Sequence, residues 1–107
     1  MNDRFLLKAC SYWLGTVITF FTVGAIANDQ AADDQAKIAA CVACHGADGI
    51  GKADQYPNLQ GQREAYMVKQ LKAFQSGARK DATMTTVVKS ISEADMKMLA
   101  KFFTQVK

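Results

Sequence analysis

Three stretches of the chain carry apolar residues at helical spacing, and polar segments rich in glycine separate them. The last stretch, residues 90–107, has an apolar face that recurs every three or four residues and consists of Leu99, Phe102, Phe103 and Val106. Ser92 precedes this face and Asp95 follows three residues later, which favours a capping box at a helix start. We therefore predict a final helix that begins just after Ser92.

A second helix is predicted over residues 63–76. Its apolar side is formed by Tyr66, Leu71 and Phe74, which lie near helical spacing. Gly77 follows directly, and glycine suits the left-handed backbone that commonly ends a helix. The middle of the chain is therefore expected to hold one helix with a sharp end.

The remaining segments predict two shorter helices and one long loop. Asp33 or Asp34 can cap a short helix through residues 35–44, and a short helical turn is expected at residues 85–89. Glycine and proline punctuate residues 45–62, and a loop of this length is usually functional. No segment alternates convincingly as a strand, so we predict an all-α fold of about four short helices.

The beginning of the chain has a different composition. Arg4 and Lys8 precede an uncharged, largely apolar run, residues 9–28, which ends in small residues at Ala25 and Ala27. A basic start, an apolar centre and an A-x-A exit are typical of a secretory signal peptide. We expect cleavage after Ala27 and export to the periplasm.

An uncleaved membrane anchor is the alternative, because about 20 apolar residues span a bilayer. Serine, threonine and glycine dilute the run, and the small residues at its end favour cleavage. We therefore expect residues 1–27 to be a signal peptide and residues 28–107 to be a single domain. Contact with a membrane is expected only if the leader stays attached.

Composition limits what this domain can be. Trp13, the only tryptophan, lies in the expected leader, so few aromatic residues remain for a core. Domains of this size usually need a metal, a disulfide or a cofactor to complete their core. The formal net charge of the whole chain is only +3, which gives no electrostatic case for binding nucleic acid.

Residues 41–45 read C-V-A-C-H and form a C-x-x-C-H motif, which is typical of covalent haem attachment. On a helix, residues three apart lie on one face, so Cys41 and Cys44 can both reach one edge of a porphyrin. His45 follows at the helix end and can turn its imidazole to the iron. The motif predicts one haem c, bound through both thiols.

The motif has three alternative interpretations. A structural zinc site needs four ligands, and the domain offers only Cys41, Cys44 and His45 among cysteine and histidine. A thioredoxin-like dithiol expects a βαβ setting, which the pattern lacks. A plain disulfide without a cofactor is the third alternative. Haem attachment fits the export signal as well as the spacing.

The second axial position of the iron needs another residue or stays open. His45 is the only histidine, so methionine is the natural candidate. Met67, Met96 and Met98 lie in predicted helices, where packing is their more usual role. Met84 lies in residues 78–86, which we predict to be a polar loop, and is the candidate ligand, although packing remains an alternative for it.

The chain resembles the class I cytochromes c. The resemblance covers nearly all of residues 33–106 and rests on "CVACHG", "YPNLQGQREAYMVKQLKAF" and "SISEADMKMLAKFF". It is closest to small c-553-like monohaem proteins and to one half of the dihaem c-four-type proteins. The matching positions outside the haem motif are Pro57, Leu59, Gly61, Gln62, Met84 and residues 91–95. One departure is the aromatic pair Phe102 and Phe103, where many relatives have a tyrosine.

The resemblance implies a small cytochrome c fold wrapped around one haem, with iron held by His45 and Met84. It also implies that the Pro57 carbonyl accepts a hydrogen bond from His45 Nδ1–H, which would orient the ring. A simple stiffening of the loop is the other interpretation of Pro57.

These expectations describe an electron-transfer protein rather than an enzyme. It would be a monomeric, periplasmic carrier between a donor dehydrogenase or quinol-oxidising complex and a terminal acceptor. Two other hypotheses are a haem-based sensor with an open iron site and a membrane-tethered subunit of a larger complex.

Overall fold

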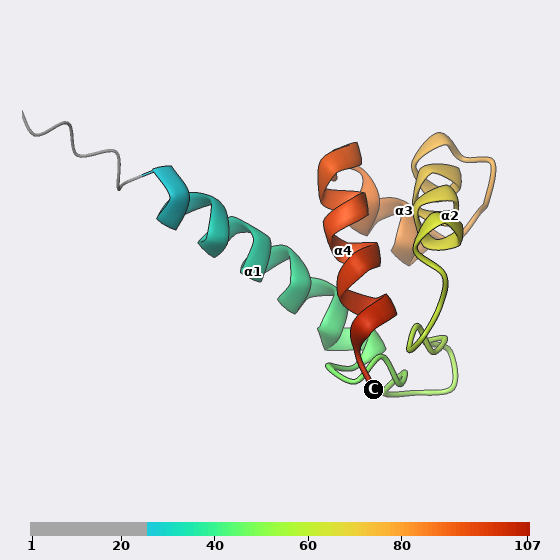
Figure 1. The fold of residues 1–107 in the computed structure, drawn as a ribbon. Helices are drawn as coiled ribbons and strands as arrows, with labels where there is room; N and C mark the ends of the chain where they lie inside the picture. The colour runs from blue at the N-terminus through green and yellow to red at the C-terminus, as the bar shows by residue number, and fades with distance from the viewer. Residues whose placement is uncertain (1–25) are drawn as a thin grey trace, which may run out of the picture.

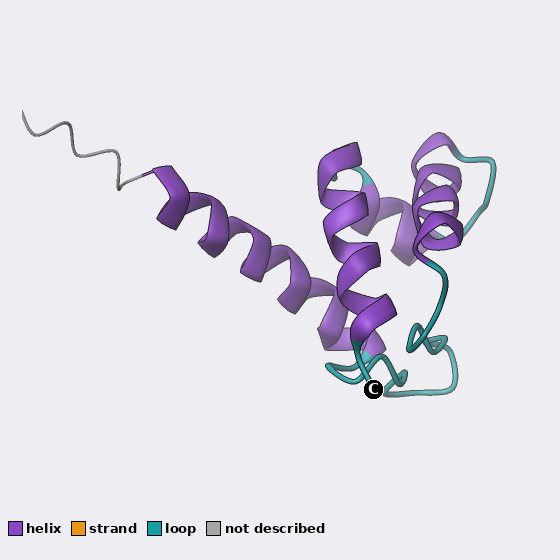
Figure 2. Ribbon diagram, viewed as in Figure 1, coloured by secondary structure: helices purple, strands orange, loops and turns teal. Residues whose placement is uncertain are grey.

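The computed structural model describes residues 26–107, which form four helices and no strand (Figure 1). The helices are α1 (Ile26–His45), α2 (Glu64–Ser76), α3 (Ala82–Val88) and α4 (Glu93–Gln105). Figure 2 shows that loops connect the helices throughout this part of the chain. The predicted all-α class, with about four helices, is confirmed.

The start of α1 differs from the prediction. The helix begins at Ile26, so Asp33 and Asp34 lie inside it and do not cap its first turn. Asp33 pairs with Lys37 one turn later, and Asp34 accepts a hydrogen bond from the side chain of Gln30 one turn earlier. Such i,i+4 pairs stabilise a helix interior, which offsets the weak helix propensity of aspartate.

Most of the predicted signal peptide, residues 1–27, lies outside the described residues. Among residues 26–107, none of the helices combines the length and the apolar character needed to cross a membrane.

The ends of α2 and α4 agree with the sequence pattern. Gly77 ends α2 in the left-handed conformation, with φ of 81°. At the start of α4, the Ser92 side chain accepts from the Asp95 amide, and the Asp95 side chain accepts from the Ser92 amide. This capping box satisfies two amides that would otherwise lack partners at the helix start.

The segment around Met84 was predicted as a polar loop, and this is wrong. Asp81 caps α3, and its side chain accepts the backbone N–H of Met84 at 2.8 Å. The helix therefore begins at Ala82, ahead of the turn predicted for residues 85–89. The Asp81 carboxylate favours a helix start here, in a sequence rich in threonine that has little helix preference of its own.

Helix α4 is central to the packing. It lies against both α1 and α2, while α3 packs against α2 (Figure 1). The beginning of α1 extends away from the other helices. The buried apolar side chains form two adjoining groups. The first comprises Phe74, Val88, Ile91, Met96 and Leu99, and the second comprises Met67, Ala100 and Phe103.

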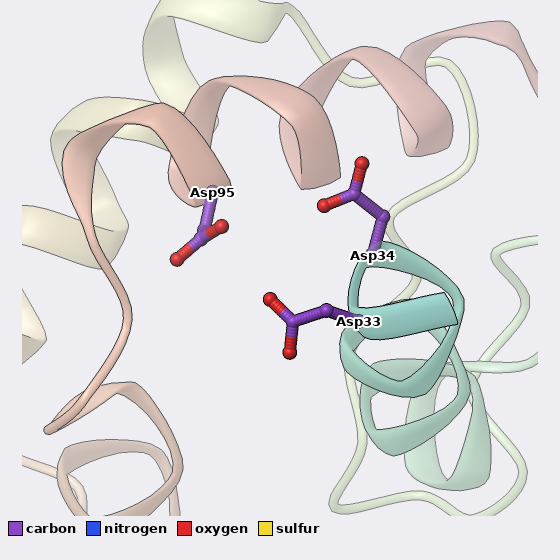
Figure 3. A group of neighbouring side chains, drawn as sticks. All are labelled: Asp33, Asp34 and Asp95. Carbon is purple, nitrogen blue, oxygen red and sulfur yellow. The ribbon is translucent and has the colours of Figure 1, made fainter. Parts of the chain in front are cut away.

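A polar bridge fastens α1 to the start of α4. Lys37 on α1 bonds to Asp33 on its own helix and to Asp95 on α4, the latter at 2.9 Å. Figure 3 shows the carboxylates of Asp33, Asp34 and Asp95 facing one another across this contact. Bonds from Ser92 and Lys37 lower the pKa of Asp95 to about 2.

We expect this bridge to make the free energy of unfolding depend on pH in the acid range. Because the pKa of Asp95 is about 2 in the folded protein against an ordinary 3.8, ionised Asp95 stabilises the fold above pH 3.8. That stabilisation is lost as the pH falls through 2. The Asp95→Asn variant should therefore unfold at lower urea concentration than the unsubstituted protein near pH 6, and the difference should shrink between pH 4 and pH 2.

The Asp54→Asn variant is the matched control, because Asp54 is an exposed loop carboxylate. Its urea midpoint should stay within the small range of ordinary surface substitutions. A difference for Asp95→Asn that stays constant from pH 6 to pH 2 contradicts the prediction.

Candidate functional site

The last turn of α1 places the C-x-x-C-H motif against the core. Cys41 is half-buried and packs against both apolar groups, while Cys44 lies one turn further along the same side of the helix. His45 is the final residue of α1 and is buried, with 7% of its surface exposed. Cys41 and Cys44 are not joined in a disulfide, and burial raises the pKa of the Cys41 thiol.

The imidazole of His45 is held from two sides. Its Nδ1–H donates to the Pro57 carbonyl oxygen, with 2.8 Å between the two heavy atoms. The imidazole also makes an edge-to-face contact with the ring of Phe103 on α4, and the two ring centroids are 6.4 Å apart. Because Nδ1 is engaged as a donor, the lone pair is left on Nε2, which is the nitrogen available to a metal.

The loop that presents Pro57 is braced by hydrogen bonds of its own. The Gly49 carbonyl accepts from the amides of Leu59 and Gln60, at 2.7 and 3.0 Å. The Asn58 side chain accepts from the Gly51 amide at 2.8 Å. These bonds close the loop on itself, so the Pro57 carbonyl is positioned by the backbone and not by proline stiffness alone.

Two adjoining cavities of about 190 and 380 Å³ lie beside the motif. Six residues line both of them, namely Cys41, His45, Pro57, Phe74, Arg79 and Met84. Leu71 and Leu99 add apolar walls to the smaller cavity. The structure therefore brings all five sequence-predicted site residues to the walls of one hollow region, from α1, the long loop and α3.

Methionines are distributed unequally around this hollow. Met84 is half-buried on α3 and lines both cavities. Met96 is almost fully buried in the core, with 1% of its surface exposed, and Met98 packs beside the same apolar group. Met67 is also buried and reaches the smaller cavity. Met84 is the methionine that lines both cavities together with His45.

Sequence reasoning did not single out Arg79. Its guanidinium nevertheless lies 4.6 Å from the centre of the Phe74 ring. It also donates to the Gln70 side chain at 2.7 Å and lines both cavities. A basic residue just beyond a helix end is too common to predict a functional role from sequence. The contact with Phe74 arises from the turn after Gly77.

These residues fit a covalently bound haem. The walls are mainly apolar, two thiols stand one turn apart, and a buried imidazole presents Nε2. A methionine thioether completes the donor set. A histidine nitrogen and a methionine sulfur are one of the axial ligand pairs found in electron-transfer haem proteins.

Comparison with known proteins points the same way. Residues 32–107 match the protein family Cytochrome c. Cytochrome c-554(548) of Halomonas halodenitrificans is 42% identical over 81 residues, which cover 73% of this chain and 96% of that protein. The thiosulfate dehydrogenase electron acceptor of Thiomonas intermedia is 43% identical over 64% of this chain and 32% of its own length.

A solved structure extends the likeness to the fold. The cytochrome c4 structure from Acidithiobacillus ferrooxidans superposes with a TM-score of 0.61 at 39% identity, over 70% of this chain and 42% of that one. The chain spans nearly all of the Halomonas protein and less than half of the other two.

The loop that carries Pro57 should tolerate no side chain at Gly51. A Cβ atom there would overlap the carbonyl oxygen of Tyr56, which is backbone and cannot move independently of the loop. We expect Gly51→Ala to lower the free energy of unfolding by about 3 kcal/mol, measured by urea unfolding.

Gly61→Ala is the matched control in the same loop. Gly61 has a positive φ of 66°, but an added Cβ would meet nothing within 4 Å. Backbone strain alone should then cost about 1 kcal/mol. Equal losses in the two variants would show that Gly51 is not closely packed.

Proposed function

Because this chain belongs to the cytochrome c family, we propose that it is a periplasmic monohaem carrier whose iron is held by His45 and Met84. Members of the family carry electrons and bind haem c covalently through a cysteine pair, which here is Cys41 and Cys44. The chain is accordingly an electron-transfer protein rather than an enzyme. When bound, haem supplies an iron that alternates between the ferrous and ferric states.

His45 is the proposed first axial ligand. The hydrogen bond from Nδ1–H to Pro57 fixes the tautomer and directs Nε2 away from the loop. Donation to a carbonyl also increases the basicity of a ligating imidazole. Burial at 7% exposure keeps water from competing for the ring. Pro57 thus acts through His45, as a support for the ligand.

Met84 is the proposed second axial ligand. A thioether favours ferrous iron and so raises the reduction potential relative to a second imidazole. With His45 and Met84 holding both axial positions, the iron would keep the same ligands on reduction and would offer no position to an external ligand. The shared lining of the two cavities by His45 and Met84 is the observation that carries this proposal.

The proposed role is transfer between a donor dehydrogenase or quinol-oxidising complex and a terminal acceptor, by a monomer in the periplasm. A relative named as the electron acceptor of thiosulfate dehydrogenase supports a dehydrogenase as donor. The basic start, apolar run and small-residue exit of residues 1–27 support export and cleavage.

Met84→Leu should leave the second axial position of the haem iron without a protein ligand. In the purified ferric protein, the sulfur-to-iron charge-transfer band should disappear, and the ferrous protein should bind carbon monoxide rapidly. The reduction potential should fall because the thioether is lost. Absorption spectroscopy and a redox titration measure these changes.

Met98→Leu is the matched control, because Met98 is half-buried in the core group and outside both cavity linings. Its spectrum and potential should equal those of the unsubstituted protein. A high-spin ferric spectrum in the unsubstituted protein would instead favour a sensor with an open site.

Export can be tested by intact mass. The periplasmic protein should lack residues 1–27 and carry the mass of one haem, and it should show no tryptophan fluorescence because Trp13 leaves with the leader. A full-length mass with haem attached would indicate that the leader remains as a membrane tether.

A further inference from the structure

The helix that carries Met84 is short and is fastened by side chains at both ends. At its start, the Asp81 carboxylate accepts the backbone N–H of Met84 itself. Among the described helices, the backbone of α3 comes close only to α2, while Val88 shares a buried core group with Met96 and Leu99 of α4. The contact between α2 and α3 therefore contributes to keeping Met84 at the cavity wall.

Gln75 on α2 supplies a hold of this kind at the other end of α3. Its Nε2 group donates to the carbonyl oxygens of Val88 and Ile91, both at 2.9 Å. A side-chain amide has two N–H groups, so both donors are used. Although Gln75 lies at the surface, it joins α2 to the last residue of α3 and to the segment before α4.

The position of Val88 links this bond to Met84. The two residues are four apart on α3, so they lie on the same face of the helix. Val88 is fully buried and Met84 is half-buried and lines both cavities. Fixing the Val88 carbonyl therefore limits how far the Met84 face can swing away from the hollow.

We propose that Gln75 is a positioning residue that keeps Met84 on the iron. This inference rests on the proposed function, in which Met84 is the second axial ligand. In the haem-loaded protein, α3 exchanges between two arrangements. In the bound arrangement Met84 occupies the axial position, and in the released arrangement Met84 has left it. The hydrogen bonds donated by the Gln75 side-chain amide exist only in the bound arrangement and shift the equilibrium towards it.

Imidazole binding to the ferric, haem-loaded protein measures the released fraction, because added imidazole can occupy the axial position only when Met84 has left. Its apparent affinity is then proportional to that fraction. In Gln75→Leu, which preserves size but removes both donors, we expect the apparent imidazole affinity to rise about fivefold. This corresponds to about 1 kcal/mol, at about 1.4 kcal/mol for each factor of ten.

Thr104→Val is the matched control. The Thr104 hydroxyl also contacts two backbone carbonyls, those of Gln62 and Ala100, both at 2.8 Å. It lies on α4, apart from α3. This variant should lower the urea midpoint about as much as Gln75→Leu, yet leave imidazole affinity unchanged. Gln75→Arg, which restores N–H donors at the position, should return the affinity towards that of the unsubstituted protein.

The outcomes separate the two proposals. A rise in apparent imidazole affinity for Gln75→Leu, with no rise for Thr104→Val, supports the positioning role. An equal rise for Thr104→Val means that general loss of stability releases Met84, and no rise in either means that Gln75 does not hold it; both results overturn the inference. If Met84→Leu itself fails to raise imidazole affinity, the assignment of Met84 as ligand is wrong, whatever Gln75 does.

Discussion

The hydrogen bond between His45 Nδ1–H and the Pro57 carbonyl is the contact on which the arrangement of this protein depends. It joins the end of α1 to the long loop, at a point where Phe103 of α4 also touches the imidazole. A ring held from two directions keeps one orientation, which fixes the position of Nε2. The internal bonds of the loop, centred on the Gly49 carbonyl, keep the acceptor in place.

The core is arranged around the same point. Its buried apolar side chains form two groups, and Cys41 packs against both. Hollow space beside Cys41, with volumes of about 190 and 380 Å³, leaves this core incomplete for the protein alone. A small domain buries a limited share of its surface. Covalent haem therefore adds apolar mass where the chain lacks it, which explains how so few aromatic residues suffice.

How much was predictable differs between elements. The start of α4 followed from Ser92 and Asp95, and the end of α2 followed from Gly77, because caps depend on residues within one turn. The start of α1 was misplaced because Asp33 can act either as a cap or as the partner of Lys37 one turn on. The local helix around Met84 was missed because its stability depends on the Asp81 cap and on packing against α2.

By itself, the sequence determined the all-α class and the haem-binding motif of Cys41, Cys44 and His45. These properties follow from spacing along the chain, which a helix converts directly into a shared face. Met84 and Pro57 were predicted as site residues from a methionine in a polar segment and from the family resemblance. Only the tertiary structure decided that Met84 faces the same hollow as His45, that Arg79 turns onto Phe74, and that Gln75 reaches across to Val88. Such contacts join residues far apart in the chain, and their geometry depends on how α2, α3 and α4 pack together.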